Sequence, residues 1–158
     1  MKIKTVFALL LSSSVLFGNE LKVTADSFDG DEKQRIAIFQ GDVKIKRGVD
    51  ELNASKVTIY TDEKHEPIKM VAEGNVSFFV KTDNNSTYTG QAQKTIYLPK
   101  IKEYQFYTNV HLRQINEKKQ IDGDKVILNT IDGKAIAQGA NKEPVIMIFN
   151  IKDKNESK

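Results

Sequence analysis

The stretch Phe39-Gln40-Gly41-Asp42-Val43-Lys44-Ile45 has two close relatives further along this 158-residue chain. They are Ala72-Glu73-Gly74-Asn75-Val76-Ser77-Phe78 and Phe106-Tyr107-Thr108-Asn109-Val110-His111-Leu112, whose valines follow at intervals of 33 and 34 residues. Apolar and polar residues alternate in all three, which is typical of antiparallel strands with one buried and one wet face. The repeat therefore indicates that one β unit is used several times.

A second kind of string follows each of these three stretches. Its copies are Leu52–Tyr60, Tyr88–Leu98 and Ile121–Asn129, with a weaker copy at Leu21–Phe28. Ile136–Gly139 is a fourth, shortened copy of the first string. We expect an all-β fold of four units, near 21–49, 52–82, 88–116 and 121–151, with no helix after residue 20. Chance similarity within an all-β chain is the alternative.

The glycines of the repeat lie in mid-strand, where glycine usually marks a bulge or a bend. Gly41 and Gly74 occupy the same place in their units, whereas Thr108 stands where a third glycine is expected. We expect a bend repeated in every unit, with Thr108 as the position that departs from the rule. The pairs of aspartates around Gly30 and Gly123 lack the ligand-rich loop of a calcium site, so they are interpreted as turns.

The N-terminus has the features of an export signal. Lys2 and Lys4 precede an apolar run over 6–17, which is shorter than the roughly 20 residues of a membrane span. We predict a signal peptide over 1–18, cleaved after Gly18, followed by one domain over 19–151. The charged residues 152–158 are expected to form a disordered tail. An uncleaved membrane anchor is the alternative for 1–18.

Composition excludes several classes of chemistry. The chain has no cysteine, so it forms no disulfide, thiolate metal site or thiol nucleophile. Residues 1–18 hold two lysines and no acids, so their removal takes the net charge from +3 to +1 and gives no support for a nucleic-acid partner. His65 and His111, the two histidines, are expected to be solvated. No motif for catalysis, a metal or a cofactor is found, so we do not expect an enzyme.

The apolar face of each unit continues from one unit to the next, which suggests a trough rather than an ordinary core. The side chains expected to line it are Phe39, Val43, Ile45, Met70, Val76, Phe78, Phe106, Val110, Leu112, Met147 and Phe149. Simple core packing is the alternative for each. The last segment, Val145–Ile151, is apolar on both faces, so it would leave a hydrophobic sheet edge that a second protomer could cover.

The chain resembles the OstA-like family. The resemblance rests on Val23–Asp26, Gln40–Val43, Leu52–Val57 and Ala72–Val76, and it spans Asn19–Ile151. It implies a twisted, open β-jellyroll of two facing antiparallel sheets without enzymatic activity. It also implies binding of the lipid A part of lipopolysaccharide between the sheets, and its transfer through the periplasm from an inner-membrane export complex to an outer-membrane translocon. Protomers would stack head to tail as a homo-oligomer. A membrane-anchored partner of the same fold and a periplasmic structural β-solenoid are the alternatives.

Four asparagines carry an acid two residues before them and a serine or threonine two residues after them. They are Asn53, Asn75, Asn85 and Asn155. Asn-x-Ser/Thr is the acceptor motif of N-glycosylation, and the added acid resembles the extended motif of bacterial oligosaccharyltransferases. Asn85, in a predicted loop, and Asn155, in the tail, are the better candidates, because Asn53 and Asn75 belong to repeat strands.

Overall fold

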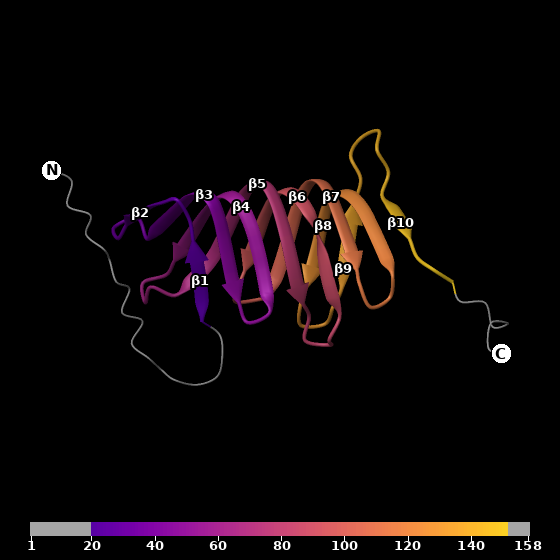
Figure 1. Ribbon diagram of the computed structural model, residues 1–158, viewed down its shortest axis with the longest axis horizontal. Helices are drawn as coiled ribbons and strands as arrows, with labels where there is room; N and C mark the ends of the chain where they lie inside the picture. Colours follow the sequence, from indigo (N-terminus) through magenta and orange to yellow (C-terminus); the bar gives the residue numbers. More distant parts are fainter. Residues whose placement is uncertain (1–19, 152–158) are drawn as a thin grey trace.

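Ten antiparallel β-strands form a single sheet in the computed structural model, which describes residues 20–151 (Figure 1). The strands are β1 (Leu21–Thr24), β2 (Ser27–Asp31), β3 (Ile36–Arg47), β4 (Asp50–Thr61), β5 (Pro67–Lys81), β6 (Thr87–Leu98), β7 (Glu103–Gln114), β8 (Lys119–Asn129), β9 (Ala135–Gln138) and β10 (Ile146–Ile148). The sheet order is β1-β3-β4-β5-β6-β7-β8-β10, with β2 on β3 and β9 on β8. The all-β prediction is confirmed. Within residues 20–151 no helix is long and apolar enough to cross a membrane.

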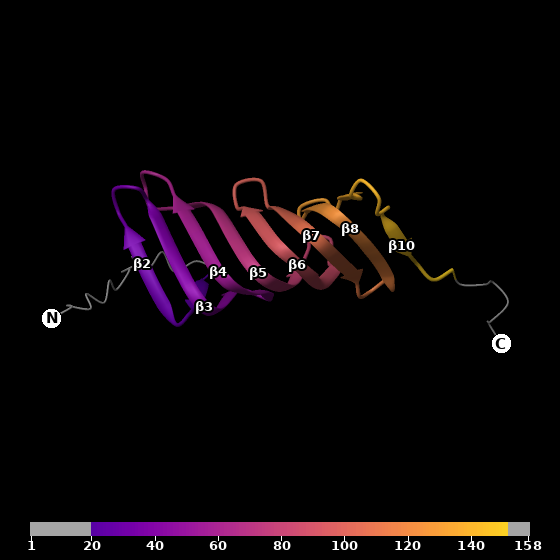
Figure 2. The same ribbon diagram turned by 90° about the horizontal axis from the view of Figure 1, so that it is seen from above.

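The sheet is folded over on itself, so that one sheet makes two facing layers. The pairing of each long strand with its neighbour is interrupted near the middle, and the strand bends there. The pairing of β4 with β5 has a second irregularity, between Tyr60 and Thr61. One layer, called the β1 layer, contains β1 and β10 with the second halves of β3, β5 and β7 and the first halves of β4, β6 and β8. The other halves, with β2 and β9, form the β2 layer (Figure 2). The two facing sheets expected from the sequence are thus two layers of one sheet.

Pairs of residues in the left-handed backbone region produce the bends of β3, β5 and β7. Gly74 and Asn75 have φ values of 84° and 45°, and Gly41 and its successor in β3 have 81° and 46°. In β3 two such residues oppose one in β4, which is the arrangement of a β-bulge. Thr108 and Asn109 adopt φ values of 66° and 51°, so the bend is kept where the glycine is missing. The expected bend is confirmed in the first three units, whereas in the fourth unit β9 ends at Gln138, before Gly139.

The bends act differently on the two kinds of strand. In β5, Ala72 and Val76 are both buried, so the inward-facing parity of the strand is the same on both sides of the bend. In β6 the buried residues are Ala92 before the bend and Thr95 and Tyr97 after it, so the parity is inverted. Simple alternation along the sequence therefore places only one half of β6 correctly, and β4 and β8 behave in the same way.

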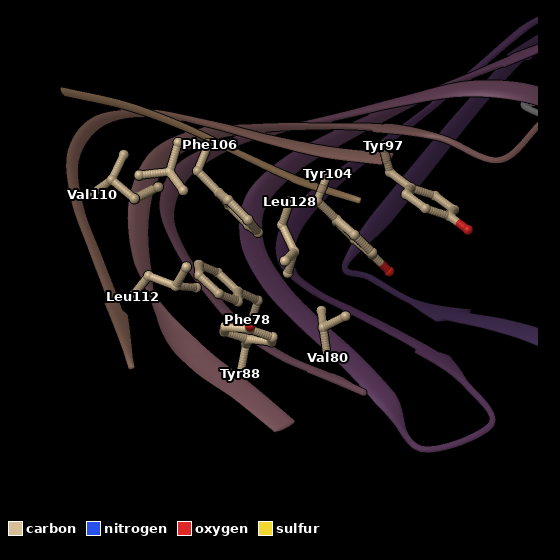
Figure 3. Close-up of a cluster of buried hydrophobic side chains, with 11 residues drawn as sticks. Phe78, Val80, Tyr88, Tyr97, Tyr104, Phe106, Val110, Leu112 and Leu128 are labelled. Atoms are coloured by element: carbon tan, nitrogen blue, oxygen red, sulfur yellow. The ribbon is translucent and has the colours of Figure 1, made fainter. Parts of the chain in front are cut away.

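Two clusters of buried apolar side chains fill the space between the layers. The N-terminal cluster consists of Val43, Ile45, Ala54, Val57, Ile59, Ala72 and Val76. The C-terminal cluster consists of Phe78, Val80, Tyr88, Ala92, Tyr97, Tyr104, Phe106, Val110, Leu112, Val126 and Leu128. Met70 packs against both, so the apolar interior is continuous along the molecule. Figure 3 shows side chains of the C-terminal cluster pointing toward one another from the two layers.

The structure corrects one detail and confirms another near the sheet ends. The segments Asp29–Asp31 and Asp122–Asp124, interpreted as turns, lie inside strands β2 and β8. The expected hydrophobic edge is confirmed: β10 ends the sheet, and its three side chains are each about half exposed, at 50–52%. The predicted signal peptide over 1–18 and the predicted tail over 152–158 lie outside the described residues.

Candidate functional site

Most of the side chains predicted to line the trough lie between the two layers. Seven of them are buried: Val43, Ile45, Val76, Phe78, Phe106, Val110 and Leu112. Phe39 and Met70 are partly buried and pack against the clusters. Met147 and Phe149 instead lie at the C-terminal end of the sheet, where each is 52% exposed. Contact of these eleven residues with lipid stays a prediction.

Aromatic rings form a row that crosses the interior. Phe78, from the β1 layer, stacks on Phe106 of the β2 layer with ring centroids 4.0 Å apart. Phe106 is followed by Tyr104 at 5.9 Å, and Tyr104 stacks on Tyr97 at 4.3 Å (Figure 3). The guanidinium carbon of Arg47 lies 5.0 Å from the centre of the Tyr97 ring. The row therefore runs from the apolar centre of the C-terminal cluster to a positive charge.

A small cavity, the Arg47 cavity, lies between the layers where this row ends. It is lined by Leu21, Ile45, Arg47, Asp50, Glu51, Leu52, Val57, Met70, Ala72, Thr95, Tyr97 and Tyr104. Its volume of about 30 Å³ is room for about two water molecules. Both clusters contribute to its wall, so the cavity lies at the junction between them.

Polar groups from both layers meet at one side of the Arg47 cavity. Arg47 and Asp50 lie at the two ends of the β3–β4 turn, in the β1 layer. Arg47 Nη2 donates to Tyr97 Oη at 2.7 Å and lies 3.8 Å from Asp50 Oδ2. Tyr104 Oη donates to Asp50 Oδ2 at 3.5 Å, and the Lys81 N–H donates to Asp50 Oδ1 at 2.9 Å. The contacts of Arg47 with Tyr97 and of Asp50 with Tyr104 join the two layers at the ends of their strands.

The electrostatics of this group are unusual for a surface turn. Burial raises the pKa of the Asp50 carboxyl, although the Lys81 N–H and the Arg47 guanidinium oppose the shift. Burial likewise raises the pKa of the Tyr104 hydroxyl above its ordinary range. Thr95, only 1% exposed, has no hydrogen-bond partner for Oγ1 among the described residues. The cavity therefore combines an apolar wall, a partly buried ion pair and an unused hydroxyl.

A second group of contacts joins the layers further along the same side. The Asp83 N–H, in the β5–β6 turn, donates to the Thr130 carbonyl at 2.8 Å. Lys102 Nζ, in the β6–β7 turn, lies 3.6 Å from Asp83 Oδ2. Turns of the β1 layer thus touch turns of the β2 layer here, whereas on the opposite side the layers are joined by the bent strands themselves.

Sequence patterns did not single out Arg47, Asp50, Thr95 or Tyr97. Tyr97 and Thr95 follow the parity inversion of β6, so alternation places them on the wrong face. Arg47 and Asp50 flank Gly48 and Val49 and look like ordinary turn residues in the sequence. Their role depends on the opposite layer, which only the folded arrangement brings to them.

Both histidines are exposed. His65 lies in the β4–β5 turn, and His111 Nδ1 pairs with Asp122 Oδ1 at 2.7 Å with its side chain 63% exposed. Among residues 20–151 no three side chains of the metal-ligating types gather as a possible metal site.

Asn85, one of the four asparagines predicted as glycosylation sites, is exposed in the β5–β6 turn, with φ of 65°.

The other three sequons differ from Asn85. Asn53 Nδ2 donates to Ser77 Oγ at 3.4 Å within the sheet. Asn75 is exposed but belongs to the bend of β5. Asn155 lies outside the described residues. Glycosylation stays a prediction for all four, and Asn85 is the one that the structure presents on an exposed turn.

Comparison with known proteins identifies the family to which the chain belongs. The chain has 18% sequence identity to LptH, the LptA-homologous periplasmic component of the lipopolysaccharide transport device of Pseudomonas aeruginosa, whose crystal structure it matches with a TM-score of 0.75. The match covers 84% of this chain and 96% of LptH, so the two share a fold. No curated protein matches the sequence. The model of the LptA/(LptD N-terminal domain) LPS transport proteins matches residues 22–134, and the chain belongs to this family.

Proposed function

We propose that this protein binds the lipid A part of lipopolysaccharide between its two layers and passes it through the periplasm. The observation that carries the proposal is the continuous apolar interior, in which Met70 connects the two clusters. Exposing an acyl chain to water costs about 0.8 kcal/mol for each CH₂ group. An interior that is apolar from β1 to β9 lowers this cost at every step of the path.

Lipid entry requires the two layers to separate. The Arg47 cavity, at about 30 Å³, is far smaller than one acyl chain, so the clusters as they stand leave no room for it. On the bent side the layers are covalently continuous, whereas the side closed by turns is joined by contacts such as Arg47–Tyr97 and Asp83–Thr130. We therefore expect the layers to open at the turns and to hinge at the bends. Methionine side chains such as that of Met70 repack readily around irregular apolar groups.

The free edges of the sheet support a head-to-tail assembly. β10 is the last strand, and Ile146, Met147 and Ile148 are about half exposed on it. β1 and β2 end the sheet at its other end. Pairing of β10 with the β1–β2 edge of the next protomer would satisfy both edges and join the apolar interiors. Such a homo-oligomer would connect an inner-membrane export complex with an outer-membrane translocon, after cleavage of a signal peptide at Gly18.

A structural β-solenoid with a permanently solid core is the competing function, since the clusters are closely packed. Quenching of tryptophan fluorescence distinguishes the lipid-binding function from the structural one. A single introduced tryptophan can be observed by itself, because the chain has no native tryptophan. In Phe39→Trp the new side chain lies on the inner face of the β2 layer, and lipid A with brominated acyl chains should quench its fluorescence. Phe79→Trp, on the outer face of β5, is the matched control and should be quenched much less. Equal quenching at the two positions, or none at either, would favour the solid core.

A further inference from the structure

Arg47 differs from the other cations of its turn in where its charge lies. Its side chain is 29% exposed, and among residues 20–151 it is the only lysine or arginine that lines the Arg47 cavity. Lys46, the preceding residue of β3, is 60% exposed and pairs with Glu51 at 3.1 Å on the outer face. Neighbouring residues of one strand thus place one cation outside and one at the entrance to the apolar interior.

The guanidinium of Arg47 has donor capacity that its present neighbours do not use. A guanidinium carries five N–H donors in a fixed fork that matches the oxygens of a carboxylate or phosphate in pairs. The structure gives Arg47 one hydrogen bond, to Tyr97 Oη, and a longer contact of 3.8 Å with Asp50. That contact is too long for the two-pronged pairing that arginine makes with a well-placed anion.

The surroundings of Arg47 define the ligand as an amphiphile. On its inner side the cavity wall is apolar, with Ile45, Leu52 and Met70. Three residues with hydroxyl groups line the same cavity: Tyr97, Tyr104 and Thr95, whose Oγ1 has no partner among residues 20–151. A molecule with acyl chains toward Met70 and a phosphate toward the β3–β4 turn would satisfy both sides of the cavity.

We propose that Arg47 is the anchor for a phosphate group on the headgroup of the lipid whose acyl chains enter the interior. This inference rests on the proposed function, and it assigns recognition of the negatively charged headgroup to Arg47. Asp50 holds the place of the anion in the free protein and is displaced when the phosphate arrives. Asp50 Oδ1 accepts a hydrogen bond from the Lys81 N–H, so we expect the carboxylate to pivot about Oδ1 as Oδ2 turns away from Arg47.

The roles of Arg47 and Asp50 predict changes of opposite sign. Arg47→Gln removes the charge and should weaken binding of a phosphorylated lipid about tenfold or more, the range of a charge-assisted hydrogen bond. Asp50→Asn removes the competing carboxylate but keeps an oxygen that can accept from the Lys81 N–H. It should therefore bind the same lipid more tightly than wild type. Lys46→Gln is the control with the same loss of charge, and it should bind like wild type.

The test compares bisphosphorylated lipid A with the same lipid A after removal of its phosphates, both in one detergent, by displacement of a fluorescent lipid. Wild type should prefer the phosphorylated form about tenfold, and R47Q should lose this preference while it still binds the dephosphorylated form. Inorganic phosphate alone should not compete, because a free anion lacks the acyl chains; competition at the affinity of the lipid would assign the site to free phosphate instead. Circular dichroism confirms that each variant is folded.

The outcomes separate this inference from the proposed function. Failure of wild type to bind either lipid would overturn the proposed function. Binding of both lipids by wild type with no preference, or a preference that R47Q retains, would overturn the role of Arg47 alone. Weaker binding of the phosphorylated lipid by D50N than by wild type would also contradict it.

Discussion

Phe78 and Phe106 stack face to face across the interior, with ring centroids 4.0 Å apart, although one belongs to the β1 layer and the other to the β2 layer. Phe106 is fully buried and Phe78 is 3% exposed. The pair therefore does two things. It holds the layers together in the free protein, and under the proposed function it lies on the path that we expect a lipid chain to take when they separate.

Phe106→Ala should destabilise the fold strongly. Truncation of a buried phenylalanine leaves a cavity and costs about 3–5 kcal/mol of unfolding free energy. Phe79→Ala, on the outer face of β5 and 36% exposed, is the matched control and should cost less than about 1 kcal/mol. Urea denaturation followed by circular dichroism measures both. Equal losses for the two variants would contradict the packing described for the C-terminal cluster.

Thr108→Gly should stabilise the protein. Thr108 is exposed, with φ of 66°, a backbone region that costs a branched residue about 1–2 kcal/mol and costs glycine nothing. Glycine also gains freedom in the unfolded chain, so the net gain should be below about 1 kcal/mol. Gly74→Ala is the converse change and should destabilise, because φ is 84° and a Cβ would lie 2.7 Å from Ser55 Oγ. A loss of thermal stability in Thr108→Gly would show that the bend tolerates threonine without strain.

Asp50→Asn should raise stability at neutral pH. Burial raises the folded-state pKa of the Asp50 carboxyl above its unfolded value, so the folded protein disfavours the ionised form. Stability is therefore lost as pH rises from the ordinary aspartate range through the raised pKa. The variant should melt at a higher temperature than wild type at pH 7, and the difference should vanish at a pH below the ordinary aspartate pKa. A difference in melting temperature that grows on acidification would contradict this prediction.

Asp62→Asn should behave in the opposite way. Hydrogen bonding from the Glu66 N–H lowers the pKa of the Asp62 carboxyl, and the Lys64 N–H also donates to it, at 2.8 Å. The folded protein therefore favours the ionised form, and its stabilising effect is present above the ordinary aspartate pKa and lost as pH falls. Melting temperatures at pH 7 should be lower for this variant than for wild type, with the gap closing in acid.

Met147→Lys should weaken the proposed head-to-tail assembly. Met147 is 52% exposed on β10, and a charge on this strand disfavours pairing with another sheet edge. Ile101→Lys, in the β6–β7 turn and 49% exposed, places a similar charge between two strands inside the sheet order and serves as the control. Sedimentation velocity should show wild type and I101K as oligomers and M147K as smaller species. Unchanged assembly of M147K would exclude β10 as the contact.

Asn85 should be the glycosylated asparagine among the described sequons, provided that the native host carries an oligosaccharyltransferase for the extended motif. It lies on an exposed turn, whereas Asn53 is hydrogen-bonded within the sheet. Intact-mass analysis of the protein from its native host should show a glycan that disappears in Asn85→Gln and persists in Asn53→Gln. A bare Asn85 in the native protein would end this prediction.

Local patterns were sufficient for the strands and the bends, because alternation and mid-strand glycine are properties of single strands. Residues of β3, β5 and β7, such as Val43 and Phe78, could be placed in the interior because parity is kept through those bends. Tyr97 could not, because the inward-facing parity of β6 is inverted across its bend. Arg47 could not either, since its partner Tyr97 is 50 residues away in sequence and in the opposite layer. The folding of one sheet into two layers is a relation between strands, which no single strand encodes.

Photo-crosslinking in cells tests the central claim, that lipid passes between the layers, most directly. A photoreactive amino acid at Phe78, which is 3% exposed, should capture lipopolysaccharide, whereas the same group at Ser77, on the other face of β5, should not. Phe106 and His111 provide a second inward and outward pair on β7. Adducts at Phe78 and Phe106 but not at Ser77 and His111 are the predicted result. Capture from Ser77 and His111 alone would contradict the account.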